Sequence, residues 1–161
     1  MLQNVFRRAV LTTALTIGLS SAAFAAFATE PPSTGLGQAW PNTTDVSVSP
    51  RYHAYVFVLG GIQYIQINDL NGNVLGSVGT AGGQFIVLPI GKFAQYVSTP
   101  QHAAAASNNA RPASSPATVY NDGATTVTAT PMSDGTTQLT ASPVTAQDTC
   151  TDPAICSSNG P

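Results

Sequence analysis

Positively charged side chains are scarce in this sequence: its 161 residues include five Lys and Arg, and two of these, Arg7 and Arg8, lie near the N-terminus. Nucleic-acid binding needs several Lys or Arg contacts to phosphates, and adhesion to anionic lipid needs clustered cations. Removal of residues 1–28, predicted below, leaves three basic residues against seven acidic ones, a formal net charge of −4. We therefore expect no nucleic-acid partner, and no membrane partner once the signal is removed.

Cysteine is also rare, which limits metal and redox chemistry. The two cysteines, Cys150 and Cys156, have five residues between them, and neither a further Cys nor a nearby His accompanies them. Zinc sites and redox pairs use a shorter spacing or additional ligands. The pair instead predicts a disulfide that closes the tail 146–161 in an oxidising compartment. We expect no metal site and no cofactor.

Catalytic motifs are missing as well. The chain contains no Gly-x-Ser-x-Gly elbow and no GxGxxG phosphate loop. The sequence from Asp69 resembles the start of a calcium loop, but its glycine, Gly72, comes too early for the loop pattern, so a hairpin turn is expected there. Of the two histidines, His102 falls in a predicted linker and His53 at the start of a predicted strand. No catalytic residue is therefore assigned.

The N-terminus has the parts of a secretory signal peptide in the expected order. Arg7 and Arg8 supply the positive start, an apolar stretch follows, and small-x-small patterns end at Ala25 and Ala28. We predict a signal helix over residues 1–28 with cleavage after Ala28, or alternatively after Ala25. A transmembrane anchor is the other interpretation, because the apolar run approaches the length that a bilayer needs. The signal predicts a secreted, periplasmic or cell-surface protein.

Residues 45–98 are the predicted β-rich core. Their β-branched and aromatic residues gather in short runs separated by turns that contain glycine, and loops this short favour an antiparallel meander. The fold class is therefore mainly β, with a small sandwich or barrel-like arrangement. The expected strands are Tyr52–Leu59, Ile62–Asn68, Val74–Val78, Gln84–Leu88 and Phe93–Ser98.

The pattern along two of these strands predicts their burial. In Ile62–Asn68 the alternation places Ile65 and Ile67 on an apolar face and Gln66 and Asn68 on a polar one, so this strand is expected to be half-buried.

Two other runs, residues 55–59 and 85–88, are apolar on both faces. Such strands are expected to be covered on both sides, and a single small sheet cannot provide that cover. A second sheet, a closed barrel or a partner is therefore required.

The regions around the core are poor in large apolar residues. Residues 29–44 are predicted to be an exposed lead-in and residues 99–117 a flexible linker. Residues 118–145 contain two similar Thr-rich stretches, each preceded by Asp-Gly, and predict either a hairpin that supplies a second layer or a solvated stalk. The C-terminal region as a whole is of low complexity, rich in Ala, Ser, Thr and Pro.

Aromatic side chains are the remaining candidates for a binding surface. The residues proposed for it are Trp40, Tyr52, Tyr64 and Tyr96, although aromatic residues of a β-domain usually fill the core. We expect a small exported β-protein that is non-catalytic and binds a protein, a glycan or copies of itself, with unpaired strand edges and low charge permitting a surface fibre. The alternative is a small secreted hydrolase that uses His53 with an unidentified Ser or Asp.

Overall fold

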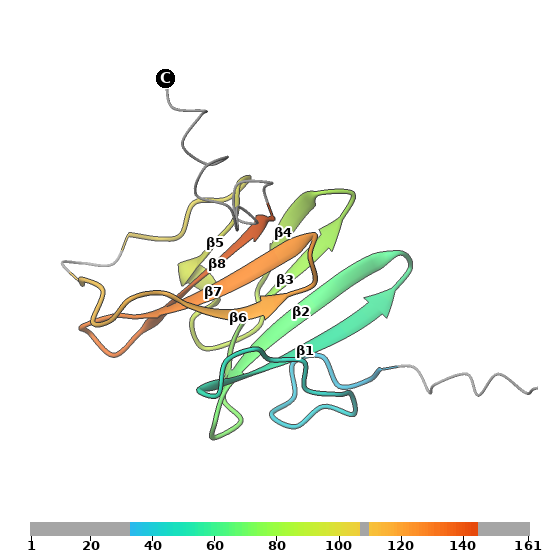
Figure 1. Cartoon of the computed structure of the whole chain (residues 1–161), viewed down its shortest axis with the longest axis horizontal. Coiled ribbons are helices and arrows are strands. Elements are labelled where there is room, and N and C mark those ends of the chain that lie inside the picture. The colour runs from blue at the N-terminus through green and yellow to red at the C-terminus, as the bar shows by residue number, and fades with distance from the viewer. Residues whose placement is uncertain (1–32, 107–109, 145–161) are drawn as a thin grey trace, which may run out of the picture. The chain divides into compact units, whose positions relative to one another are not determined.

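The computed structural model describes residues 33–106 and 110–144 of the chain. The prediction of a mainly β protein is confirmed: the described residues form two four-stranded sheets (Figure 1). The signal peptide, its cleavage positions Ala25 and Ala28, and the Cys150–Cys156 pair lie outside the described residues.

The first sheet is an antiparallel meander, as the short glycine-containing turns predict. Each turn places glycines at positive φ, among them Gly60 and Gly61 between the first two strands and Gly82 and Gly83 between the last two. Each strand therefore pairs with the next along the chain. In spatial order the strands are β1 (Tyr52–Leu59), β2 (Ile62–Asp69), β3 (Val74–Ala81) and β4 (Gln84–Leu88).

The second sheet contains the Thr-rich stretches. In spatial order its strands are β5 (Val97–Ser98), β8 (Thr137–Pro143), β7 (Thr125–Pro131) and β6 (Ala117–Asn121). The β8–β7 and β7–β6 pairs are antiparallel, whereas the short strand β5 runs parallel to β8.

The predicted strand Phe93–Ser98 is wrong. The segment forms a short 3-10 helix, η1 (Ala94–Tyr96), followed by β5, which belongs to the second sheet and not to the meander. The backbone N–H groups of Lys92 and Phe93 donate to carbonyls at the start of β3, both at 2.8 Å. These bonds lead the chain across the end of the first sheet and into the second.

One core cluster joins the inner faces of the two sheets. It includes Ile65 and Ile67 from β2, Val97 from β5, and Val127 and Leu139 from β7 and β8, all at most 2% exposed. This shared core supplies the second layer that the apolar strands require.

The expectation that β1 and β4 are covered on both sides along their whole apolar runs is wrong at the end of β1 and at the middle of β4. Val58 and Leu59, at the tip of the β1–β2 hairpin, are 71% and 73% exposed, and Ile86 in β4 is 54% exposed. The tip of the β1–β2 hairpin and the outer face of β4 therefore remain apolar and solvent-facing.

A hydrogen-bonded cluster connects the two sheets at one side. The Gln63 side chain on β2 donates to Tyr120 Oη at 2.6 Å, and Tyr120 Oη donates to Asp122 Oδ2 at 3.0 Å. Burial, together with the neighbouring carboxylate, raises the pKa of Tyr120 to about 12. Burial also acts to raise the pKa of Asp122. Hydrogen bonds from the Thr125 and Ala124 amides and from Tyr120 outweigh this effect, so the pKa of Asp122 lies below its usual value.

We expect one tyrosine to ionise far above the ordinary range in an absorbance titration. The folded pKa of Tyr120 is raised, so its contribution to stability is present below pH 10 and is lost as the pH rises towards about 12. Tyr120→Phe should remove the highest phenolate transition from the titration. If the wild type and Tyr120→Phe differ only by a transition near pH 10, the inter-sheet cluster is not formed.

Candidate functional site

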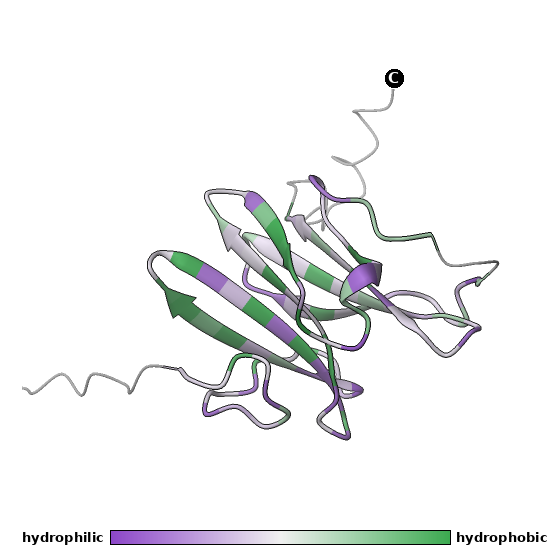
Figure 2. Ribbon diagram, turned by 180° about the vertical axis from the view of Figure 1, so that it is seen from behind, coloured by the Kyte–Doolittle hydropathy of each residue, from purple (hydrophilic) through white to green (hydrophobic). Residues whose placement is uncertain are grey.

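Two buried amides on the outer face of the first sheet organise the candidate site. Gln66 and Asn68 on β2, predicted to lie on a solvent-facing side, are both fully buried, so this expectation is wrong. Figure 2 shows the alternation of polar and apolar residues along this strand that suggested an exposed face. Residues 33–45, which we call the covering segment, lie over the two amides. Because buried amide groups need hydrogen-bond partners, the backbone of this segment supplies them.

The hydrogen bonds of these amides attach the covering segment to the sheet. Gly37 N–H donates to Gln66 Oε1 at 2.6 Å, and Gln66 Nε2 donates to the Gln38 carbonyl at 2.8 Å. Asn68 Nδ2 donates to the Ala39 carbonyl at 2.8 Å. Gln66 Nε2 also donates to Asn68 Oδ1 at 2.9 Å, so the two amides form one network. The segment expected to be an exposed lead-in therefore has a defined position on the sheet.

The end of the covering segment also closes the free edge of β1. Val46 N–H donates to the Ala54 carbonyl at 2.8 Å, and Ala54 N–H donates to Asp45 Oδ1 at 2.9 Å. Thr43 Oγ1 donates to the Val56 carbonyl at 3.3 Å. These bonds use the backbone groups that β1 does not share with β2.

The side chains of Asp45 and His53 form a short hydrogen bond at this edge. Asp45 Oδ2 lies 2.6 Å from His53 Nδ1, and the two side chains are 39% and 23% exposed. Burial acts to raise the pKa of Asp45, but hydrogen bonds from His53 and from the Ala54 and Ser47 amides outweigh it, so that this pKa lies below its usual value. The carboxylate therefore stays ionised and fixes the position of His53.

Trp40 is the most exposed aromatic residue next to this pair. Its indole meets the His53 ring edge-on, with 5.4 Å between ring centroids, and its side chain is 60% exposed. On another side it lies against Gly72 in the β2–β3 turn, where an added Cβ would come within 2.9 Å of the indole. His53 also stacks on Tyr55, with 6.0 Å between centroids. Trp40 thus combines exposure with a fixed position.

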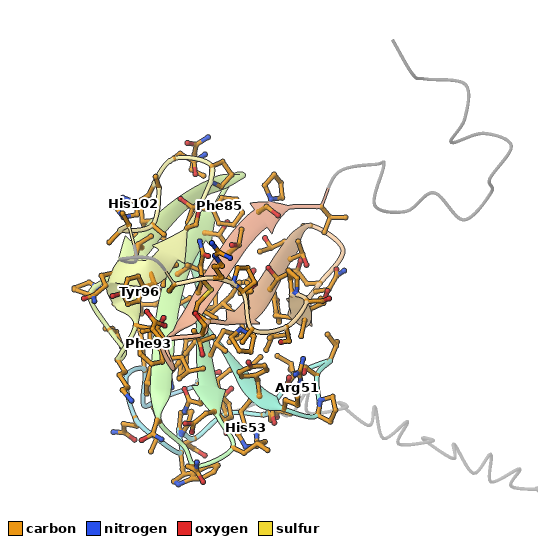
Figure 3. All side chains as sticks on the ribbon, turned by 90° about the vertical axis from the view of Figure 1, so that its left-hand side faces the viewer. Arg51, His53, Phe85, Phe93, Tyr96 and His102 are labelled. Atoms are coloured by element: carbon orange, nitrogen blue, oxygen red, sulfur yellow. The ribbon has the colours of Figure 1, made fainter. Side chains whose placement is uncertain are left out.

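The other predicted aromatic candidates lie elsewhere. Tyr52 is 8% exposed and belongs to the core, Tyr64 is half-buried on the outer face of β2, and Tyr96 packs against Phe93 in η1. Figure 3 shows Tyr96 and Phe93 well away from His53. The structure therefore does not bring the four proposed residues together, and Trp40 is the most exposed of them.

A pocket of about 450 Å³ opens beside His53. Its lining includes Asp45, Ser47 and Ser49 together with two exposed apolar residues, Val48 and Leu70. We call Trp40, His53, Asp45, Leu70 and Val48 the Trp40 surface. Trp40 adjoins the pocket through its contact with His53, so this surface combines apolar side chains with one hydrogen-bonded His–Asp pair, as ligand sites commonly do.

The serines of the pocket are engaged in local structure. Ser47 Oγ donates to the Ser49 carbonyl at 3.0 Å and lies 3.3 Å from the Val119 carbonyl, while Ser49 Oγ accepts a hydrogen bond from Arg51 N–H at 3.4 Å. No described residue forms a hydrogen bond to His53 Nε2. A His–Asp pair in a pocket is therefore present, but it lacks a nucleophile bonded to the histidine.

We expect Gly72→Ala to displace Trp40 and to destabilise the β2–β3 turn. Gly72 has φ 83°, and the added methyl would also clash with the indole. Gly123→Ala is the matched control, because Gly123 has the same φ but no atom within 4 Å of the position that an added Cβ would take. Since Trp40 is the single tryptophan, a change of its fluorescence in Gly72→Ala and none in Gly123→Ala would report the displacement directly. Equal spectra would contradict this contact.

The chain matches no protein-family model, no curated protein and no solved structure. Within residues 33–106 and 110–144, no three His, Cys, Asp or Glu side chains gather in a way that could hold a metal ion. The same residues contain no helix with the length and apolar character needed to cross a membrane. Fold and site together describe a small two-sheet β-protein with one exposed aromatic surface.

Proposed function

We propose that the mature protein is exported and acts outside the cytoplasm, in the periplasm or at the cell surface, as a non-catalytic protein that binds a neutral saccharide at the Trp40 surface. The observation that carries this proposal is that Trp40 is 60% exposed although Gly72 and His53 hold its indole. A fixed aromatic side chain gives a large contact area and loses little rotamer freedom when a ligand binds.

The chemistry of the surface favours a saccharide. A sugar ring has an apolar face of C–H groups and a rim of hydroxyls, which suits an indole beside groups that donate or accept hydrogen bonds. Asp45 and His53 supply such groups at the edge of the indole. The mature chain has three basic residues in all, which disfavours a polyanionic ligand.

Calorimetric titration of the mature protein with cello-, chito- and malto-oligosaccharides tests this proposal. We expect at least one series to bind, and Trp40→Ala to weaken that binding by about tenfold or more, since an aromatic anchor of this kind contributes about 1–3 kcal/mol. Leu59→Ala is the control, because Leu59 is an exposed apolar residue on a distant hairpin tip. Both variants should unfold like the wild type. Absence of binding in all three series, or equal loss in both variants, would contradict the proposal.

A second candidate function is hydrolysis at His53, which is favoured by the short Asp45–His53 contact and the serines in the adjoining pocket. Hydrolysis of nitrophenyl esters should then disappear in His53→Ala and in Ser47→Ala or Ser49→Ala. We favour the binding function, because both serines and both Asp45 oxygens already form hydrogen bonds that maintain the edge of β1.

A further inference from the structure

The outer edge of β4 carries backbone groups that remain available for pairing. In the β3–β4 hairpin, Ala81 faces Gln84 across a two-residue turn, so alternate residues of β4 bond to β3. Phe85 and Val87 therefore direct their N–H and C=O groups away from β3. In agreement, Phe85 N–H donates to the Gln101 side chain at 3.2 Å, whereas Val87 N–H has no partner among the described residues.

The chain around this edge carries no Asp, Glu, Lys or Arg side chain. No Asp, Glu, Lys or Arg occurs between residues 81 and 91. A groove of about 600 Å³ follows the strand between β4 and the loop that contains Gln101 and His102. Figure 3 shows Phe85 and His102 on the same side of the molecule, away from His53. At the centre of the strand, Ile86 is 54% exposed.

We infer that the β4 edge pairs with the β4 edge of a second copy of this chain, in antiparallel orientation about a twofold axis at Ile86. In this register Phe85 of each copy faces Val87 of the other, and each facing pair exchanges two N–H···O=C bonds. The two Ile86 residues then form the non-hydrogen-bonded pair, in which side chains approach most closely.

A second copy fits this edge because the edge is self-complementary. The twofold axis brings each outward donor opposite an outward acceptor, and the absence of charge on the strand means that two identical edges do not repel each other. Natural proteins that keep edge strands apart usually place a charge or a proline within the strand, and residues 84–88 contain neither.

Gln101 limits this pairing, since its amide oxygen occupies the Phe85 N–H that the second copy would need. The opposite edge of the sheet is closed, because Val46 and Asp45 already bond to Ala54 on β1. An isologous contact at β4 therefore ends at a dimer and does not extend into the fibre that free edges would permit. This inference does not depend on saccharide binding.

Sedimentation equilibrium of the mature protein over a wide concentration range tests the inference. We expect a monomer–dimer equilibrium whose dissociation constant rises about tenfold or more in Ile86→Lys, because the ammonium would have to be desolvated in the contact. Val58→Lys is the matched control, since Val58 is also an exposed apolar residue, 71% exposed, on the opposite edge strand. Gln101→Ala should lower the dissociation constant, because it frees Phe85 N–H.

A strictly monomeric wild type up to about millimolar concentration would overturn the inference, since even weak specific pairing is populated there. Equal weakening by Val58→Lys and Ile86→Lys would also overturn it, because association would then follow general hydrophobicity. If Ile86→Lys does not fold, as urea unfolding followed by Trp40 fluorescence would show, Gln101→Ala decides: unchanged association in that variant contradicts the proposed edge.

Discussion

Asn68→Asp is expected to destabilise the fold by about 3–5 kcal/mol at neutral pH, the largest effect we anticipate from an isosteric change, because it places an unpaired charge in the interior. Asn68 is fully buried, and its Nδ2 donates to the Ala39 carbonyl at 2.8 Å and lies 3.4 Å from the Gly72 carbonyl. A carboxylate would direct an oxygen at these acceptors. The change should therefore detach the covering segment as well as lower global stability.

The pH dependence distinguishes this cause from general damage. Burial and facing carbonyls raise the pKa of the introduced carboxyl above the usual Asp value of about 4. The variant should thus be least impaired below about pH 4, where the carboxyl is protonated and can donate, and should lose stability as the pH rises through the raised pKa.

Urea unfolding followed by Trp40 fluorescence, repeated across this pH range, measures the effect. Asn42→Asp is the control, since Asn42 lies in the same segment and its exposed side chain has no hydrogen-bond partner among the described residues. That control should change stability by less than about 0.5 kcal/mol. Similar losses in Asn42→Asp and Asn68→Asp would contradict the buried network.

Gly91→Ala is expected to cost about 2–5 kcal/mol, from backbone strain and overpacking together. Gly91 has φ 109°, and an added Cβ would lie 2.6 Å from both the Gly76 nitrogen and the Leu75 carbonyl carbon, which are backbone atoms and cannot rotate away. The clash falls where the chain passes from the first sheet to the second, so it should separate the segment that contains Lys92 and Phe93 from β3.

Gly61→Ala separates the two contributions to this cost. Gly61 also has a positive φ, 79°, but no atom lies within 4 Å of the place where its Cβ would be added. Its substitution should cost only the backbone strain, about 1–2 kcal/mol. Thermal or denaturant unfolding of both variants measures the difference, and equal losses would show that the chain does not cross β3 at Gly91.

The turns and the β-branched runs made most of the fold predictable. The strands β1 to β4 begin and end within a few residues of their expected positions, because glycine pairs at 60–61 and 82–83 leave few alternatives to a tight hairpin. The two similar Thr-rich stretches correctly indicated strands β7 and β8, since an Asp-Gly turn precedes each of them.

What could not be predicted depends on contacts between distant segments. Alternation along β2 placed Gln66 and Asn68 on a polar face, but it could not show that carbonyls about 30 residues earlier would satisfy them there. Likewise, β5 is too short for its sequence to show which sheet it joins, because Val97 pairs with Leu139, which follows about 40 residues later. The sequence does indicate Trp40 as a candidate binding residue. Its contact with His53 could not be predicted, because it depends on how the covering segment lies on the sheet.

The contact of Trp40 with the β2–β3 turn and with His53 tests the central claim most directly, namely that residues 33–45 are fixed on the outer face of the first sheet and present the indole there. Nuclear Overhauser spectra of the protein should show cross-peaks from the Trp40 indole protons to Gly72 and to the His53 ring, given the close contacts described above. A Trp40 side chain with neither set of cross-peaks and with the chemical shifts of an unstructured peptide would contradict this account.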